Sequence, residues 1–362
     1  MFRSPTPWYD HYNKIIIKST DGGNNWNTVF FDQTGGLFSV FFTNNNTGYC
    51  SGGEYLYWIG QILKTTNSGI NWFYKSIPGN SHGFVSVFFP NMNTGYVGIY
   101  RNTNFYYKTT NSGDNWLQYS LPDTGDGNDI FFINSDTGFI LCSIITGSRV
   151  LRTSNGGINW SVQASYVSNS YLYSIKFVNS QTGFVGGYEN NEFIDKSTNG
   201  GLDWFRLTIP INSNFFIKSI CFVNVNTGYA VGNGFTGAVQ LIKTTNSGVN
   251  WYELGPPSSS IFSVYFINEN TGFILSDLGH LFKTTTGGEP LGIKSVGKEM
   301  PKTYSLIQNY PNPFNPSTTI EFDIPKTTFT KLIIYDITGR GIGTIVSEEL
   351  KAGTYKINFE VI

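Results

Sequence analysis

The chain has 362 residues, of which 13% are charged and 17% aromatic, with 41 glycines and a formal net charge of −1. This length fits two domains, or one large all-β domain with an appendage. The aromatic and turn-forming composition favours strands joined by tight turns, and it excludes a coiled coil, a helical bundle and a disordered chain. The balanced charge gives no electrostatic argument for nucleic acid or an anionic membrane as the main partner.

Cysteine and histidine are too few and too scattered to predict a metal site. Cys50, Cys142 and Cys221 lie 92 and 79 residues apart, with no histidine nearby. We expect three buried thiols on strands, although one pair could still bridge. No run of 18 apolar residues and no signal peptide is present, so we expect no membrane span and an incomplete N-terminus. No cofactor is expected.

The first predicted strand, residues 13–18, leads into KSTDGGNNW at 18–26, whose eight residues after the lysine, 19–26, we call the tryptophan motif. Five further copies follow: KTTNSGINW (64–72), KTTNSGDNW (108–116), RTSNGGINW (152–160), KSTNGGLDW (196–204) and KTTNSGVNW (243–251). A decayed copy, KTTTGGEP, begins at Lys283. The motif tryptophans are Trp26, Trp72, Trp116, Trp160, Trp204 and Trp251, spaced by 44 to 47 residues.

A second motif, the Thr-Gly turn, alternates with the first at the same period. It follows a short apolar strand such as SVFF (39–42), and its glycines are Gly48, Gly95, Gly138, Gly183, Gly228 and Gly272. Each unit is then predicted to contain four short strands, which is the pattern of a β-propeller blade. We predict seven blades, the first lacking its two inner strands, with LGIKSV (291–296) as the outer strand of the last blade. Six blades, closed by strands from both ends, is the alternative.

The tryptophan motif has a structural interpretation. The side chain at its third position is expected to accept hydrogen bonds from main-chain amides two residues on, and the glycine at its fifth position supplies the positive φ of a tight turn. The third-position residues are Asp21, Asn67, Asn111, Asn155, Asn199 and Asn246. Asparagine keeps the hydrogen bonds without the charge, which favours a structural role over calcium binding or catalysis. The tryptophan is expected to enter the seam between neighbouring sheets.

A basic residue precedes each motif, at Lys18, Lys64, Lys108, Arg152, Lys196, Lys243 and Lys283. We interpret these side chains as solvated strand ends whose stems pack on a neighbouring tryptophan, with a ring that binds an acidic partner as the alternative.

The pattern S/T-x-D/N-x-G-x-x-W resembles the Asp-box, or bacterial neuraminidase repeat. The whole set over residues 14–288 is similar to propellers related to the photosystem II assembly and stability factor. The resemblance implies the fold far more than an activity, because one fold serves many functions.

The composition changes after the repeats. We predict a propeller over 1–290, a linker over 291–304 and a small β-sandwich over 305–362. YPNPFNPSTTI (310–320), YDITGR (335–340) and LKAGTY (350–355) resemble the C-terminal sorting domain of the bacterial type IX secretion system. The motif residues are Pro311, Pro313, Phe314, Asn315 and Pro316. The resemblance implies export to the cell surface or the medium through that machinery. The family continues with another strand pair and a basic tail, so we expect an incomplete C-terminus too.

Catalysis is the weaker functional interpretation. A sialidase-like glycosidase needs an arginine cluster, and Arg152 and Arg206 are assigned to the framework. A carboxylate pair could come from Asp123, Asp126, Asp129, Glu189, Glu192 or Asp195, which we interpret as solvated loop acids. No catalytic residue is therefore assigned.

Binding is the stronger interpretation. The two motifs share one face of the ring, so variable loops occupy the opposite face, where recognition is expected. The candidate ligand residues there are Tyr57, Trp58, Tyr100, Arg101, Tyr188 and Phe235. Aromatic platforms suit sugars or peptides. We expect a secreted or surface-displayed binding or scaffold propeller, with an extracellular glycoside hydrolase as the alternative.

Overall fold

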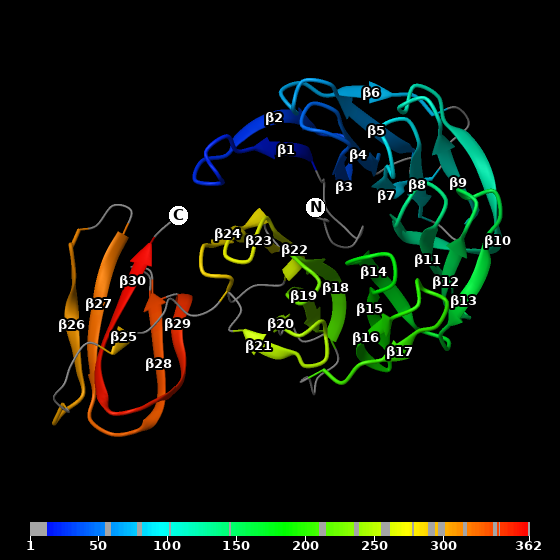
Figure 1. Ribbon diagram of the computed structural model, residues 1–362. Coiled ribbons are helices and arrows are strands. Elements are labelled where there is room, and N and C mark those ends of the chain that lie inside the picture. The colour runs from blue at the N-terminus through cyan, green and yellow to red at the C-terminus, as the bar shows by residue number, and fades with distance from the viewer. Residues whose placement is uncertain are drawn as a thin grey trace.

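The computed structural model is built of strands throughout the residues that it describes (Figure 1). These residues are 13–54, 59–77, 82–100, 103–144, 146–209, 215–234, 239–254, 261–276, 279–288, 294–295, 301–313, 317–335, 339 and 341–360. Within them, no helix is long and apolar enough to cross a membrane.

The strands of the repeat region form antiparallel sheets in chain order, and Figure 1 shows them arranged around a ring. The first sheet has two strands, β1 (Lys14–Lys18) and β2 (Asn27–Asp32). The second has four, β3 (Gly36–Phe42), β4 (Gly48–Gly53), β5 (Gly60–Thr65) and β6 (Phe73–Lys75).

The third sheet joins two four-strand units through one long strand. It contains β7 (Phe84–Phe88), β8 (Gly95–Ile99), β9 (Thr103–Thr109), β10 (Leu117–Phe132), β11 (Gly138–Ile144), β12 (Gly147–Thr153) and β13 (Ser161–Ser165). The first part of β10 pairs with β9 and its last part with β11. The strand is therefore the outer strand of one unit and the inner strand of the next.

Three more sheets complete the repeat region. Two have four strands: β14 (Tyr171–Phe177), β15 (Gly183–Glu189), β16 (Asn191–Ser197) and β17 (Phe205–Arg206), then β18 (Phe215–Phe222), β19 (Gly228–Gly234), β20 (Val239–Thr244) and β21 (Tyr252–Leu254). The last has three, β22 (Ile261–Phe266), β23 (Gly272–Ser276) and β24 (Leu281–Thr284).

Neighbouring sheets are held together by apolar contacts and by hydrogen bonds near the ring centre. The cores lie between units; for example, Phe139 and Leu141 of β11 pack with Leu172 and Ile175 of β14. Near the centre, a side chain of each of the first five inner strands accepts a hydrogen bond from a main-chain N–H of the next inner strand. The pairs are Ser39 with Val87, Ser86 with Ile130, Asp129 with Ile175, Ser174 with Ile220 and Ser219 with Val264.

A β-bulge interrupts each of the six inner strands one residue before that acceptor or, in β22, before the equivalent Ser263. The bulged residues are Phe38, Val85, Asn128, Tyr173, Lys218 and Phe262. A bulge re-aims side chains and increases the local twist. These positions lie at the end of the inner strand opposite to the Thr-Gly turn.

The C-terminal region contains two further sheets. One has the strand order β25 (Lys294–Ser295), β30 (Gly353–Glu360), β27 (Ser317–Ile324) and β26 (Ser305–Tyr310). The other pairs β28 (Thr328–Tyr335) with β29 (Gly341–Leu350). Phe322, Val346 and Tyr355 belong to one apolar cluster, so side chains of both sheets share a core.

Two expectations about the ends of the repeat region need correction. Lys294 and Ser295 pair with β30, so LGIKSV does not supply the outer strand of β22–β24. In the described residues β24 pairs only with β23, and β1 only with β2, so the strands of the two ends do not mix in one sheet. The expectation for the thiols is confirmed, because Cys50, Cys142 and Cys221 are free and buried.

Candidate functional site

The tryptophan motif forms a self-contained turn. In the copy at 65–72, Gly69 N–H donates to Thr65 Oγ1 at 3.0 Å, and Asn71 N–H donates to Asn67 Oδ1 at 3.0 Å. The third-position side chain thus bonds to the amide four residues on, not two as expected. Ser68 and Gly69 have φ of 62° and 75°, so two consecutive residues adopt the left-handed conformation, which explains the fifth-position glycine.

The Thr-Gly turn contacts the tryptophan motif on the same face of each unit. Asn44 Oδ1 accepts from the N–H groups of Asn46 and Thr47, both at 2.8 Å, and the carbonyl of Asn46 accepts from Ser68 N–H at 2.9 Å. The same main-chain bond recurs in the other units. The donor–acceptor pairs are Ser112–Asn93, Gly156–Asp136, Gly200–Gln181, Ser247–Asn226 and Gly287–Asn270. Both turns therefore have a structural role, because they hold each unit of the propeller together.

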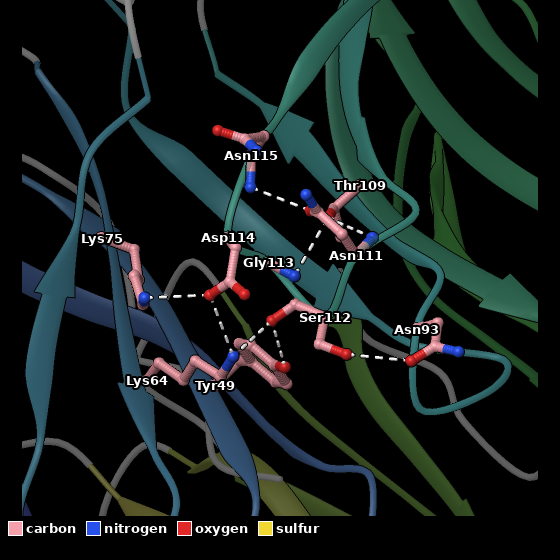
Figure 2. Close-up of polar contacts among 10 residues, drawn as sticks. All are labelled: Tyr49, Lys64, Lys75, Asn93, Thr109, Asn111, Ser112, Gly113, Asp114 and Asn115. Atoms are coloured by element: carbon pink, nitrogen blue, oxygen red, sulfur yellow. Dashed lines mark hydrogen bonds and ion pairs between the residues drawn. The ribbon is translucent and has the colours of Figure 1, made fainter.

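The basic residue before each motif links one unit to the next (Figure 2). Lys64 Nζ and the Tyr49 hydroxyl both donate to the main-chain carbonyl of Ser112, each at 2.7 Å. Lys108, Arg152, Lys196 and Lys243 make the equivalent bond to the carbonyls of Gly156, Gly200, Ser247 and Gly287. The interpretation as solvated strand ends is wrong in this respect, because these head groups satisfy carbonyls of the neighbouring unit.

The motif tryptophans pack in the seams between units, as expected. Trp160 meets Phe132 of its own unit at 6.2 Å and Tyr106 of the preceding unit at 5.8 Å, both edge-on. Trp204 contacts Phe177 and Phe139 in the same way. These indoles serve the framework.

The predicted ligand residues are only partly described. Tyr57, Trp58, Arg101 and Phe235 lie outside the described residues. Tyr100 and Tyr188 occupy the same position, at or just past the end of the second strand, in units that are separated by another unit. The structure therefore does not bring these two together.

Tyr188 instead belongs to an aromatic cluster around Lys218, which sequence reasoning missed. Tyr188 and Phe216 have ring centroids 4.8 Å apart, and Lys218 Nζ lies 4.0 Å from the centroid of Tyr173 and 5.0 Å from that of Phe216. Burial lowers the pKa of Lys218 to about 8. We call Tyr171, Tyr173, Tyr188, Phe216 and Lys218 the lysine–aromatic cluster; it lies on the face opposite to the two turns.

The cluster follows from the local sequence. Lys218 is the bulged residue of β18, at a position held by aromatic residues in three other units and by valine and asparagine in the remaining two. The sequence feature that could have identified Lys218 is its position one residue before Ser219. Among the described residues no carboxylate pairs with Lys218, so its charge faces aromatic rings.

Several candidate acids are not solvated loop residues. Asp195 lies on β16 with 5% exposure, where it accepts from the Tyr166 hydroxyl at 2.9 Å and pairs with Arg206 at 2.5 Å. Glu189 pairs with the same guanidinium at 3.0 Å. Burial and the Asp195 carboxylate raise the pKa of Tyr166. This network joins β16, β17 and the segment after β13, as the framework assignment of Arg206 predicted.

Asp129 is a second buried acid, with 4% exposure. It takes the place of the serine found at this position in the other five inner strands. Its carboxylate accepts from the N–H groups of Ile130 and Ile175, both at 3.0 Å, and pairs with Lys176 at 3.6 Å. The Asp123 side chain lies outside the described part, and Glu192 is buried at 8% exposure.

In the C-terminal region, Pro311 and Pro313 are exposed between β26 and β27, and Phe314, Asn315 and Pro316 lie outside the described residues. A shallow, largely apolar cavity of about 380 Å³ lies between β26, β27 and β28, lined by Leu306, Ile320 and Leu332 among others. None of the predicted ligand residues lines it.

Known structures resemble the repeat region. No protein-family model and no curated protein sequence matches the chain. A GH74 enzyme from Niastella koreensis matches with TM-score 0.56 and 14% identity over 79% of this chain and 50% of the enzyme. The Hadza microbial sialidase Hz136 matches with TM-score 0.50 and 12% identity over 70% of this chain and 65% of the sialidase. YCF48 bound to D1 peptide has 17% identity, TM-score 0.41 and coverage of 79% and 100%.

The chain thus spans half the length of the GH74 enzyme and about two thirds of the sialidase. At these identities the likeness concerns the fold. The chain is an all-β protein whose repeat region has the β-propeller fold.

Proposed function

We propose that the chain is a binding or scaffold propeller that acts outside the cell and contacts its ligand with the lysine–aromatic cluster. The observation that carries this proposal is Lys218, a cation set between two aromatic rings with no carboxylate partner in the described residues. An anionic group of a ligand would supply the missing counter-charge. The adjacent rings would stack on the apolar part of the same ligand.

The chemistry of the cluster indicates the ligand class. Aromatic faces bind sugar rings and peptide side chains at little entropic cost. A lysine beside them selects an acidic group, such as a uronic acid or a glutamate side chain. We therefore propose an acidic glycan or an acidic peptide, on the face opposite to the tryptophan motifs.

Binding by purified protein to arrays of acidic and neutral glycans and to peptide libraries tests the proposal. Lys218→Met should weaken binding of any ligand found by at least about tenfold. Lys75→Met is the matched control, because Lys75 lies on the turn face and pairs with Asp114 at 3.0 Å. Equal binding by wild type and Lys218→Met would reject the cluster as the site.

A glycoside hydrolase is the second candidate, favoured by the likeness in fold to a GH74 enzyme and a sialidase. Hydrolysis would need two free carboxyl groups about 5–10 Å apart across a cleft. Asp129 and Asp195 are already bonded within the frame. Release of reducing sugar from any glycan by the purified chain would establish this function instead.

We further propose that the C-terminal region directs export through the type IX secretion machinery. The support is the sequence of 310–320, 335–340 and 350–355, of which 317–320 lie on β27 and 353–355 on β30. A fluorescent protein fused to residues 301–362 should leave cells of a type IX-competent bacterium but remain inside a mutant that lacks the machinery. Retention in both strains of a fusion that also carries the family's last strand pair and basic tail would contradict the proposal.

A further inference from the structure

The two-stranded sheet β1–β2 occupies a place in the ring where the other units have inner strands as well. It contacts the sheets on both sides of it. On one side, Trp26 packs edge-on against Phe273 of β23 at 5.9 Å, and Lys283 Nζ donates to Asn24 Oδ1 at 2.6 Å. On the other side, Ile16, Val29 and Phe30 pack against the second sheet.

The inner edge of β1 has no strand beside it in the described residues. Ile17 is 43% exposed there. The equivalent residue, one before the basic residue, is almost fully buried in the next five units: Leu63, Tyr107, Leu151, Asp195 and Ile242, none more than 5% exposed. Ile17 is therefore an apolar residue at a position that the other units cover.

The tryptophan motif next to this edge also lacks partners. In five other units the indole packs against a phenylalanine of its own inner strand, as Trp72 does with Phe42 at 5.8 Å. Among the described residues Trp26 has only Phe273. Within the described part of the chain, Gly22 N–H makes no bond to a Thr-Gly turn, whereas the fourth-position N–H of the six later motifs does.

The contacts of the second sheet lead to the same conclusion. In most units the fifth-position glycine of the motif lies against an aromatic residue of the preceding unit; a Cβ on Gly113 would be 2.9 Å from Tyr49. For Gly69 the three atoms nearest to such a Cβ, at 3.5–3.6 Å, belong to Phe42 and Trp72 of its own unit. None of these three atoms belongs to the preceding unit, β1–β2.

We propose that the edge of β1 is a docking surface for an inner β-hairpin of the kind found in the other units, with the pattern Ser-[Val/Ile]-x-Phe followed by Asn-Thr-Gly-[Tyr/Phe]. The register is fixed by the six other units, in which the glycine pairs with the first motif residue and the aromatic pairs with the basic residue. The hairpin's glycine would pair with Ser19, its aromatic with Lys18, and its next residue would cover Ile17.

Residues 1–12, MFRSPTPWYDHY, do not supply this hairpin. They contain neither the Ser-[Val/Ile]-x-Phe nor the Thr-Gly pattern, whereas the hairpin Gly36–Gly53 spans 18 residues. The occupant is therefore a further segment with the repeat sequence, added by strand pairing to an open sheet edge.

A fusion tests the proposal: a second copy of residues 36–53 placed before Met1 of the full chain. Hydrogen exchange of the β1 amides should slow by at least roughly tenfold in the fusion, because strand pairing removes them from water. The matched control deletes the copy of Gly48, which shifts the register by one residue and turns the second strand over. The control should exchange as fast as the parent chain.

Ile17→Lys gives a second test. At 43% exposure the substitution should leave the parent chain folded, and it should abolish the protection in the fusion. If the fusion fails to fold, a synthetic peptide of residues 36–53 added to the parent chain replaces it, with the same expected protection of β1. Unchanged exchange of β1 in a folded fusion, or with saturating peptide, would overturn the proposal.

Discussion

The ammonium group of Lys243 donates a hydrogen bond to the main-chain carbonyl of Gly287, 3.1 Å away in the motif of the next unit. The side chain is 7% exposed, so the bond is made with little access to water. Four other basic residues bond in the same way. Neighbouring units are therefore joined by hydrogen bonds to main-chain carbonyls as well as by apolar contacts between their sheets.

Removal of one such donor should weaken the fold by an amount that depends on the neighbouring aromatic residue. Lys196 donates to Ser247 O at 2.7 Å, and the adjacent Phe184 has no hydroxyl to replace it. Lys108 shares Gly156 O with the Tyr96 hydroxyl. Lys196→Met should therefore lower the free energy of unfolding by about 1–3 kcal/mol, and Lys108→Met by less. Urea denaturation measures both, with the exposed Lys326→Met as control. An equal loss for all three would contradict the assignment.

The motif tryptophans should contribute mainly to stability. Trp116 is 4% exposed and packs against Phe89 at 5.9 Å, so Trp116→Ala should cost about 3–5 kcal/mol. The adjacent Leu117 is 63% exposed, and Leu117→Ala should change the unfolding free energy by less than about 0.5 kcal/mol. Chemical denaturation compares the two. Loss of ligand binding in Trp116→Ala without loss of stability would show that the indole is a binding residue.

The fold was predictable because both motifs satisfy their own main chain. The bond from Gly69 N–H to Thr65 Oγ1, and those from Asn46 and Thr47 to Asn44, join residues a few positions apart. These local hydrogen bonds can therefore be predicted from the types and spacing of the side chains. Two such motifs at one period predict repeated four-strand units.

Contacts between units could not be predicted in the same way. The partner of Lys64 is a carbonyl 48 residues away, and a carbonyl has no sequence signature. Asp129 and Asp195 looked like loop acids because important donors to their carboxylates, Ile175 and Arg206, lie on other strands. The environment of Lys218 could not be predicted, since its aromatic neighbour Tyr173 belongs to the preceding sheet. Prediction of the candidate site would therefore have required the strand register, which the sequence alone does not give.

The third motif position should tolerate an exchange of asparagine for aspartate but not for alanine. Asn67 Oδ1 accepts from Asn71 N–H and from Thr65 Oγ1, both at 3.0 Å. Asn67→Ala removes this acceptor and should cost about 0.5–2 kcal/mol, as for a lost capping residue, whereas Asn67→Asp keeps it. The exposed Asn71→Ala is the control. Thermal unfolding at pH 7 should give a lower Tm for Asn67→Ala than for Asn67→Asp, Asn71→Ala and wild type. A destabilised Asn67→Asp would contradict this prediction.

The same Asn67→Asp variant should be sensitive to acid. In the natural Asp21 motif, hydrogen bonds from Asn25 and Ser19 lower the pKa of the carboxyl group. A carboxyl whose pKa is lowered by folding adds stability above its unfolded pKa of about 3.9, and that stability is lost as the pH falls toward the folded value. The stability of Asn67→Asp relative to wild type should therefore fall below about pH 4. A constant difference between pH 7 and pH 2 would show that the carboxylate is not bonded as in Asp21.

Alkali should destabilise the propeller through its buried tyrosines. Burial raises the pKa of Tyr49 and of Tyr106 to about 12. In the unfolded chain both ionise near pH 10, so between about pH 10 and pH 12 the folded state holds protons that the unfolded state has lost. The free energy of unfolding should therefore fall steadily over this interval, as urea titrations at successive pH values would measure. Tyr49→Phe is the informative variant, because Phe139 and Phe184 fill the same position in other units. It should fold at pH 8 and lose stability less steeply above pH 10, and an unchanged slope would exclude Tyr49 as one of the titrating groups.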